Sequence, residues 1–145
     1  MDSAAPEPAV PLPADDELHA IVRAFYDEVY AHPWLGRFFE GVDQAHQERK
    51  LVRFFHLAWD DPFYGKLQGE YLKDEHAHMY ITAELFDLRQ ELLLAAVRER
   101  GHDEAVVQAF LAFNESWRSY VVKASRRECT DALTGHGIID VPAPR

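Results

Sequence analysis

The stretch LKDEHAHMYITAELFDL, at residues 72–88, decides the fold. Within it, Thr82 follows His76 by six positions and directly precedes a run with apolar residues at helical spacing. A threonine at such a position is a typical helix N-cap, and Ile81 and Phe86 have the spacing of a hydrophobic staple around it. The stretch therefore predicts a histidine at the end of one helix, a turn, and a capped second helix.

The surrounding sequence has helical periodicity and no sustained alternation of period two, which predicts an all-α domain. Four long helices and two short ones are expected. Their predicted ranges are 16–30, a short turn at 34–39, 43–59 with Asp43 as N-cap, 70–78, 82–98, and 103–126 with Asp103 as N-cap. Pro62, Gly65 and Gly69 predict a loop between the second long helix and the short one.

Each long helix has an apolar face at spacings of three and four residues. The residues expected to point inward are Leu18, Val22, Phe25 and Val29, with Tyr26 beside them; Gln47, Leu51, Phe54, Phe55 and Ala58; Leu85, Leu88, Leu92, Ala95 and Ala96; and Val106, Phe110, Phe113, Trp117, Tyr120 and Ala124. Only Gln47 interrupts this pattern. Gly101 is expected to end the third long helix.

Composition limits the possible functions. A chain of 145 residues with 48% hydrophobic content can bury one core, so we predict a domain over 15–128 with a flexible Pro/Ala-rich leader at 1–14 and a flexible tail at 129–145. The net charge of -10 disfavours nucleic acid and membrane partners. One cysteine, Cys129, and an N-terminus without signal-peptide features indicate a cytoplasmic protein.

Five pieces of the sequence, in this order and spacing, resemble the truncated haemoglobin family over about residues 18–122. They are Phe25–Tyr26, VYAHPWLGRFF at 29–39, Phe54–Phe55, GEYLKDEH at 69–76, and HAHMYITAELFD at 76–87. The resemblance implies a truncated globin-like two-over-two helical sandwich that binds haem b. It also implies that oxygen, nitric oxide and carbon monoxide are the ligands.

The resemblance implies a role for each matching residue. His76 corresponds to the proximal histidine that binds haem iron. Tyr26 and Gln47 correspond to the distal residues that contact the bound gas. The residues implied to contact haem are Phe39, Lys50 near a propionate, Leu51, Phe54, Phe86 and Arg89.

Haem chemistry supports these roles independently, because a broad apolar disc with an iron centre needs aromatic walls, one nitrogen donor and few polar groups. The sequence departs from the family at Asp60 and Asp61, which replace a glycine pair, and at Arg89, which replaces an apolar residue. A buried arginine needs an anionic partner. That partner could be a propionate, an anionic ligand or an acidic side chain, or the side chain could turn to solvent.

The other candidate residues have simpler expected roles. His78 is expected to be structural, His46 and His56 are secondary candidates on the distal helix, and Trp59 and Trp117 are expected to pack. The main prediction is a haem protein that binds diatomic gases, with nitric oxide dioxygenase-type activity if a separate reductase is present. The alternatives are a gas sensor or electron-transfer protein with an internal sixth ligand such as Lys50, and a haem-free interaction module.

Overall fold

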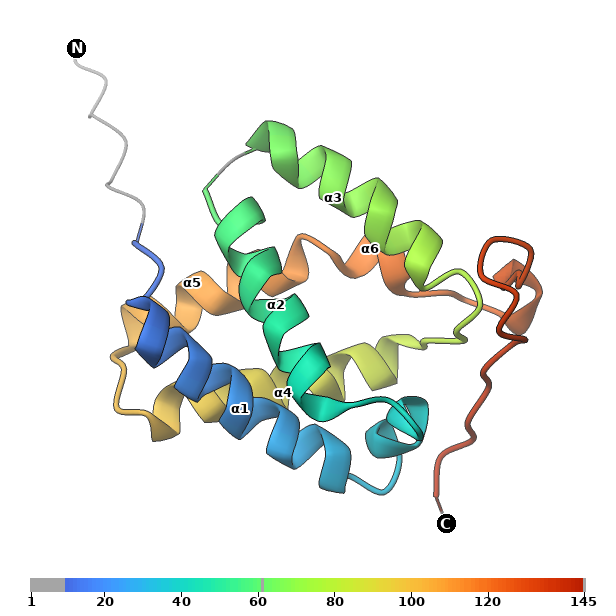
Figure 1. Ribbon diagram of the computed structural model, residues 1–145, viewed down its shortest axis with the longest axis horizontal. Coiled ribbons are helices and arrows are strands. Elements are labelled where there is room, and N and C mark those ends of the chain that lie inside the picture. The colour runs from blue at the N-terminus through green and yellow to red at the C-terminus, as the bar shows by residue number, and fades with distance from the viewer. Residues whose placement is uncertain (1–9, 61, 145) are drawn as a thin grey trace.

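The computed structural model describes residues 10–60 and 62–144, and these form an all-α fold. The helices are α1 (Asp15–Ala31), α2 (Gln44–Ala58), α3 (Pro62–Glu75), α4 (Ala83–Glu99), α5 (Glu104–Glu115) and α6 (Arg118–Val121), with two short 3-10 helices, η1 (Leu35–Phe39) and η2 (Arg126–Glu128). Figure 1 shows them in chain order from blue to red.

Helices α1 and α4 pack against each other, and each also belongs to a helix pair. α1 also packs against α2, and α4 also packs against α5, while α3 contacts α2 and α6. In Figure 1, α2 runs upward from beside α1 toward α3, which lies at the top of the view. The expected all-α fold with two pairs of helices is therefore confirmed.

Side-chain caps fix where the long helices begin, as the sequence predicted. The side chains of Asp43, Thr82 and Asp103 each accept a hydrogen bond from the backbone N–H three residues later. Such caps satisfy a backbone donor that has no partner within the helix. Gly101 follows the C-cap of α4 with φ of +87°, a conformation that glycine adopts without strain.

The segment before His76 corrects the prediction. We expected a loop up to Gly69 and a helix over residues 70–78, but α3 begins at Pro62 and ends at Glu75. Pro62 at the first helical position needs no N–H partner, so it starts a helix here. Gly69 is buried under the Tyr120 ring, where an added Cβ would lie 2.6 Å from Cε1. This glycine therefore serves close helix packing rather than a turn.

The predicted last helix is also corrected, because it breaks into α5 and α6. The Ser116 hydroxyl donates to the carbonyl of Phe113 at 2.6 Å, and the Ser116 N–H is shared between the carbonyls of Ala112 and Phe113. A side-chain hydroxyl that bonds a nearby carbonyl competes with the regular helix. After α6, Val122 is extended and the Lys123 N–H donates to Ile81 O, so the helix does not reach residue 126.

Most of the expected inward residues are buried or half-buried, with two exceptions. Ala95 and Ala124 are exposed. On α4 the buried face contains Leu93 and Val97, which shows that the helix is rotated slightly from the predicted stripe. Ala124 lies beyond the end of α6, so it has no helix face to share.

The two ends of the described chain pack against the helices. At the N-terminal end, Trp59 Nε1 donates to Val10 O at 2.9 Å, and Leu12 packs against the core. At the C-terminal end, Trp34 Nε1 donates to Val141 O at 2.7 Å, and Ile139 forms a bridge with Met79. Two residues of the tail predicted over 129–145, Ile139 and Val141, thus contact the helical part of the chain, and of the leader predicted over residues 1–14, residues 1–9 lie outside the described residues.

Within the described part of the chain, the model contains no helix with the length and apolar character that crossing a membrane requires.

Candidate functional site

His76 lies in the turn directly after α3, and one of its ring nitrogens is already engaged. The Nδ1 atom lies 2.8 Å from the carbonyl oxygen of Leu72, one helical turn earlier. Because a carbonyl only accepts, Nδ1 carries the hydrogen in this contact and the neutral ring keeps its lone pair on Nε2. No hydrogen bond to Nε2 is described among residues 10–60 and 67–144. This is the tautomer and orientation that a metal-binding histidine needs.

The protonation state of His76 also suits metal binding. Burial lowers the pKa of the imidazole to about 4, and the hydrogen bond to Leu72 opposes this only in part. The ring is therefore neutral at pH 7. A neutral imidazole is the form that binds a transition metal.

A segment that the sequence analysis assigned to the end of the last helix and the start of the tail holds the turn after His76. We call residues 123–139 the C-terminal strap. Lys123 Nζ donates to the carbonyl of His76 at 2.8 Å, and the backbone N–H groups of Thr130 and Ile139 donate to the carbonyls of Ala77 and His78 at 2.9 and 2.8 Å. Burial lowers the pKa of the Lys123 ammonium. Nothing in the composition of this segment signalled these contacts.

Tyr26 belongs to an aromatic group formed by residues of α1 and η1. Its ring centroid lies 5.0 Å from Phe25 and 6.0 Å from both Tyr30 and Phe39. Only 5% of Tyr26 is exposed, and burial raises the pKa of its phenol. The hydroxyl therefore stays protonated at neutral pH and can donate a hydrogen bond.

The predicted residues of α2 lie on a half-buried face. Gln47, Leu51 and Phe54 are all partly exposed, whereas Phe55 on the next stripe is 1% exposed. Phe54 packs against aromatic rings from the end of α5, at 4.9 Å from Trp117 between centroids. This face of α2 thus presents apolar groups that the core does not fully cover.

Lys50 extends from α2 toward α3 and pairs with a carboxylate. Its Nζ lies 3.6 Å from Glu75, the residue directly before His76. The lysine is 44% exposed and Glu75 is 31% exposed, so the pair lies at the surface. The structure therefore places Lys50 near His76 but gives its ammonium an acidic partner.

Arg89 points inward from α4, which excludes the solvent-facing alternative. Its Cζ lies 5.0 Å from the centroid of the Phe25 ring, and its Nη1 donates to Asn114 Oδ1 at 3.1 Å. The guanidinium also acts on the pKa of Tyr26 and of His76, lowering both. The arginine therefore lies within electrostatic reach of the proximal and the distal candidates. Sequence analysis did not identify Asn114 as its partner.

The remaining candidate residues are Phe86 and three histidines. Phe86 is buried and packs under the Arg118 guanidinium, at 4.4 Å from its ring centroid. His46 is exposed, and His56 pairs with Asp15 at 2.8 Å. His78 is buried beside His136, with 5.5 Å between ring centroids. The partners of Phe86, His56 and His78 in these contacts are therefore residues other than Tyr26 and His76.

The donor set fits haem when judged by its chemistry. It offers one neutral imidazole with an oriented ring, a half-buried apolar face on α2, and a protonated phenol. Trp117, which packs on Phe54, has a buried Nε1 without a hydrogen-bond partner in the described residues. An apolar disc that carries peripheral acceptors would suit such surroundings.

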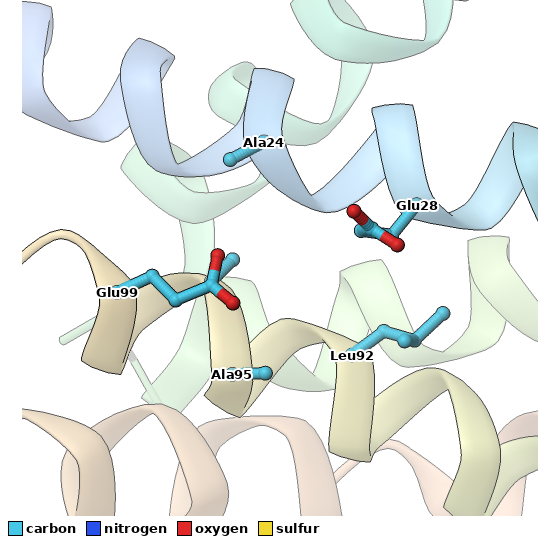
Figure 2. A pocket seen from close by; sticks show the side chains of 6 residues that line it. Ala24, Glu28, Leu92, Ala95 and Glu99 are labelled. Carbon is cyan, nitrogen blue, oxygen red and sulfur yellow. The ribbon is translucent and has the colours of Figure 1, made fainter.

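A separate shallow hollow of about 170 Å³ lies between α1 and α4 (Figure 2). Its lining consists of Ala24, Glu28, Leu92, Ala95, Ala96 and Glu99. In Figure 2 the two glutamates extend from opposite helices toward it. Two carboxylates and no nitrogen donor do not suit haem iron, so the residues around His76 and Tyr26 are the stronger candidate site.

Comparison with known proteins gives one match. The family model described as bacterial-like globin matches residues 12–121. No curated protein and no solved structure matches the chain. The match includes Tyr26, Arg89, His76 and Asn114, and it ends just before the C-terminal strap.

Proposed function

Because the chain belongs to the bacterial-like globin family, for which haem-based gas binding is the general function, we propose that it is a truncated haemoglobin holding haem b through His76. Oxygen, nitric oxide and carbon monoxide would bind on the side of Tyr26. The observation that carries this proposal is the hydrogen bond from His76 Nδ1 to Leu72 O, which leaves Nε2 available in a neutral ring.

When bound, haem supplies an iron centre that takes a histidine on one face and a gas molecule on the other. The residues of this chain would orient and shield it. Tyr26 would donate a hydrogen bond toward the gas, Gln47 would add an amide, and Leu51, Phe54 and Phe39 would keep water out. Lys50 lies at the solvent edge, where a propionate could compete for it with Glu75.

We propose that the sixth position of the iron is open at rest. Lys50 supports this, because an ammonium paired with Glu75 at 3.6 Å would have to lose both its partner and its proton to become a ligand. A resting protein with an internal sixth ligand, as in a sensor or an electron-transfer protein, is thereby less favoured.

An enzymatic activity follows from the same pocket. Oxygen, nitric oxide and one electron combine to nitrate, so a globin that holds both gases can remove nitric oxide if a separate cytoplasmic reductase returns the electron. A donor such as Tyr26 favours oxygen over carbon monoxide, because oxygen becomes partly negative when bound. The test is consumption of nitric oxide by the reduced protein in air, with nitrate as product.

An absorption spectrum tests the main proposal. The purified protein, mixed with haem, should show a Soret band with five-coordinate features when reduced, and carbon monoxide should shift it. His76→Ala should lose haem during gel filtration, since it removes the nitrogen donor. His46→Ala, which removes an exposed histidine, is the matched control and should keep haem. Equal haem retention in the two variants would refute the assignment of His76.

A further inference from the structure

We propose that Arg89 forms a binding subsite for small inorganic anions beside Tyr26, so that the protein takes azide, nitrite or similar anions at its haem. The inference rests on the proposed function, because it needs haem in the pocket. It assigns to Arg89 a ligand class that differs from neutral gases.

The first argument is that the Arg89 guanidinium lies against an apolar residue and has no carboxylate partner. Its head lies over Phe25, a residue with 0% exposure. Among the described residues, no carboxylate forms an ion pair with it within 4.0 Å, and its hydrogen-bond partners are neutral, the amide of Asn114 and the phenol of Tyr26. A partly buried guanidinium of this kind is stabilised when an anion binds.

The second argument is that a chain of hydrogen bonds fixes the orientation of the guanidinium. Asn114 accepts from Arg89 through Oδ1 and donates through Nδ2 to Gln90 Oε1 at 2.9 Å. Gln90 in turn donates to Glu115 at 3.0 Å. Since Asn114 is itself only 6% exposed, this chain fixes the orientation of Nη1. A side-chain hydrogen bond with Arg89 also acts on the Tyr26 phenol and lowers its pKa, so the remaining N–H groups of the guanidinium lie beside Tyr26 and are the ones left for a ligand.

The third argument concerns Glu48, an acidic group near Tyr26. Glu48 lies close enough to raise the pKa of Tyr26, but its carboxylate pairs with Arg23 at 3.5 Å and accepts from Gln44 at 3.0 Å. The Glu48 carboxylate therefore already has two partners, Arg23 and Gln44. The protein as a whole carries a net charge of -10, so this inward cation is an exception to a surface that repels anions.

A haem propionate is the other anion that Arg89 could bind. The position of the guanidinium over a fully buried ring favours a small free anion, because propionates need the solvent edge, where Lys50 already lies. Haem dimethyl ester, which has no free propionate, distinguishes the two. If Arg89 serves the free anion, its substitution should have the same effect with either form of haem.

The test is an optical titration of the ferric, haem-loaded protein with sodium azide at fixed pH and ionic strength. Arg89→Met should raise the Kd for azide tenfold or more, as expected for loss of a charged hydrogen-bond donor. Arg89→Gln, which can still bond Asn114, should show the same loss even if the methionine variant folds poorly. Arg89→Lys should stay within about threefold of the parent.

Two controls separate the possible outcomes. Arg98→Met removes the same charge from an exposed position of α4 and should leave the azide Kd unchanged. Carbon monoxide, a neutral ligand, should bind all variants within about threefold. An azide Kd in Arg89→Gln equal to that of the parent would overturn the subsite alone. A parent protein that takes up no haem would overturn the proposed function and the subsite with it.

Discussion

Replacement of Gly69 by alanine tests how closely α3 approaches α6. A Cβ added at Gly69 would lie 2.6 and 2.7 Å from Cε1 and Cε2 of Tyr120, with Cζ closer still. Ordinary carbon contacts lie at about 3.5–4.0 Å, so the ring would have to withdraw by roughly 1 Å. The ring cannot withdraw freely, because Trp117 packs against it with 5.9 Å between centroids.

The sign of the effect follows from two opposing contributions. Overpacking of this kind costs about 1–3 kcal/mol, whereas alanine is favoured over glycine within a helix by about 1 kcal/mol. We expect Gly69→Ala to lower the free energy of unfolding by up to about 2 kcal/mol, the difference between these two contributions. Urea denaturation followed by circular dichroism measures this difference.

A second background isolates the contact with the ring. In a Tyr120→Ala protein the clash is absent, so the added Gly69→Ala change should stabilise by about 1 kcal/mol through helix propensity alone. The double-mutant cycle should therefore give a coupling equal to the overpacking cost, about 1–3 kcal/mol. If Gly69→Ala has the same effect in both backgrounds, the reasoning about close packing is wrong.

Three further predictions concern a distal residue of the site, the support of His76 and the stability of the fold. Tyr26→Phe should speed oxygen release from the haem-loaded protein by about tenfold, since one donor is lost; stopped-flow absorbance measures the rate. Lys123→Met should raise the rate of haem transfer to apomyoglobin severalfold, because the carbonyl of His76 loses its ammonium partner. Arg100 and His102 hold the pKa of Glu17 at about 2, so Glu17→Gln should cost about 1–2 kcal/mol at pH 7 after solvent screening. Because the folded pKa is the lower one, this stabilisation is present above about pH 4.5 and lost as the pH falls to 2, where urea denaturation should no longer distinguish Glu17→Gln from the parent.

The parts of the fold that depend on local chemistry could be predicted from the sequence. The N-caps Asp43, Thr82 and Asp103 are read from residue type and position, because a cap acts within three residues. The order of the long helices followed from apolar periodicity. Gly69 could not be interpreted in this way, since a glycine in a tight helix contact and a glycine in a turn look the same in one sequence.

The candidate site also combines features that the sequence could predict with features that depend on tertiary packing. The sequence indicated His76 and Tyr26 through their resemblance to a family, but it could not show which ring nitrogen of His76 is free. Arg89 was recognised as unusual, yet its partner Asn114 is 25 positions away and on another helix. Long-range pairs of this kind depend on how helices pack, which one sequence does not encode in its spacing.

The break after Ser116 is an intermediate case. A serine within a helical pattern is common, and its hydroxyl ends the helix here only because the chain must turn toward Ile81, where the Lys123 N–H finds its acceptor. The local signal was present but ambiguous, and tertiary contact decided it.

The C-terminal strap has a consequence for how the protein opens. Three successive carbonyls after α3, those of His76, Ala77 and His78, each accept a hydrogen bond from a residue beyond position 121. Local unfolding of the turn therefore requires that the C-terminal strap detach at the same time, so the two should exchange their amide hydrogens as one cooperative unit. During synthesis, a nascent chain shorter than residue 139 would carry His76 on an incompletely braced turn.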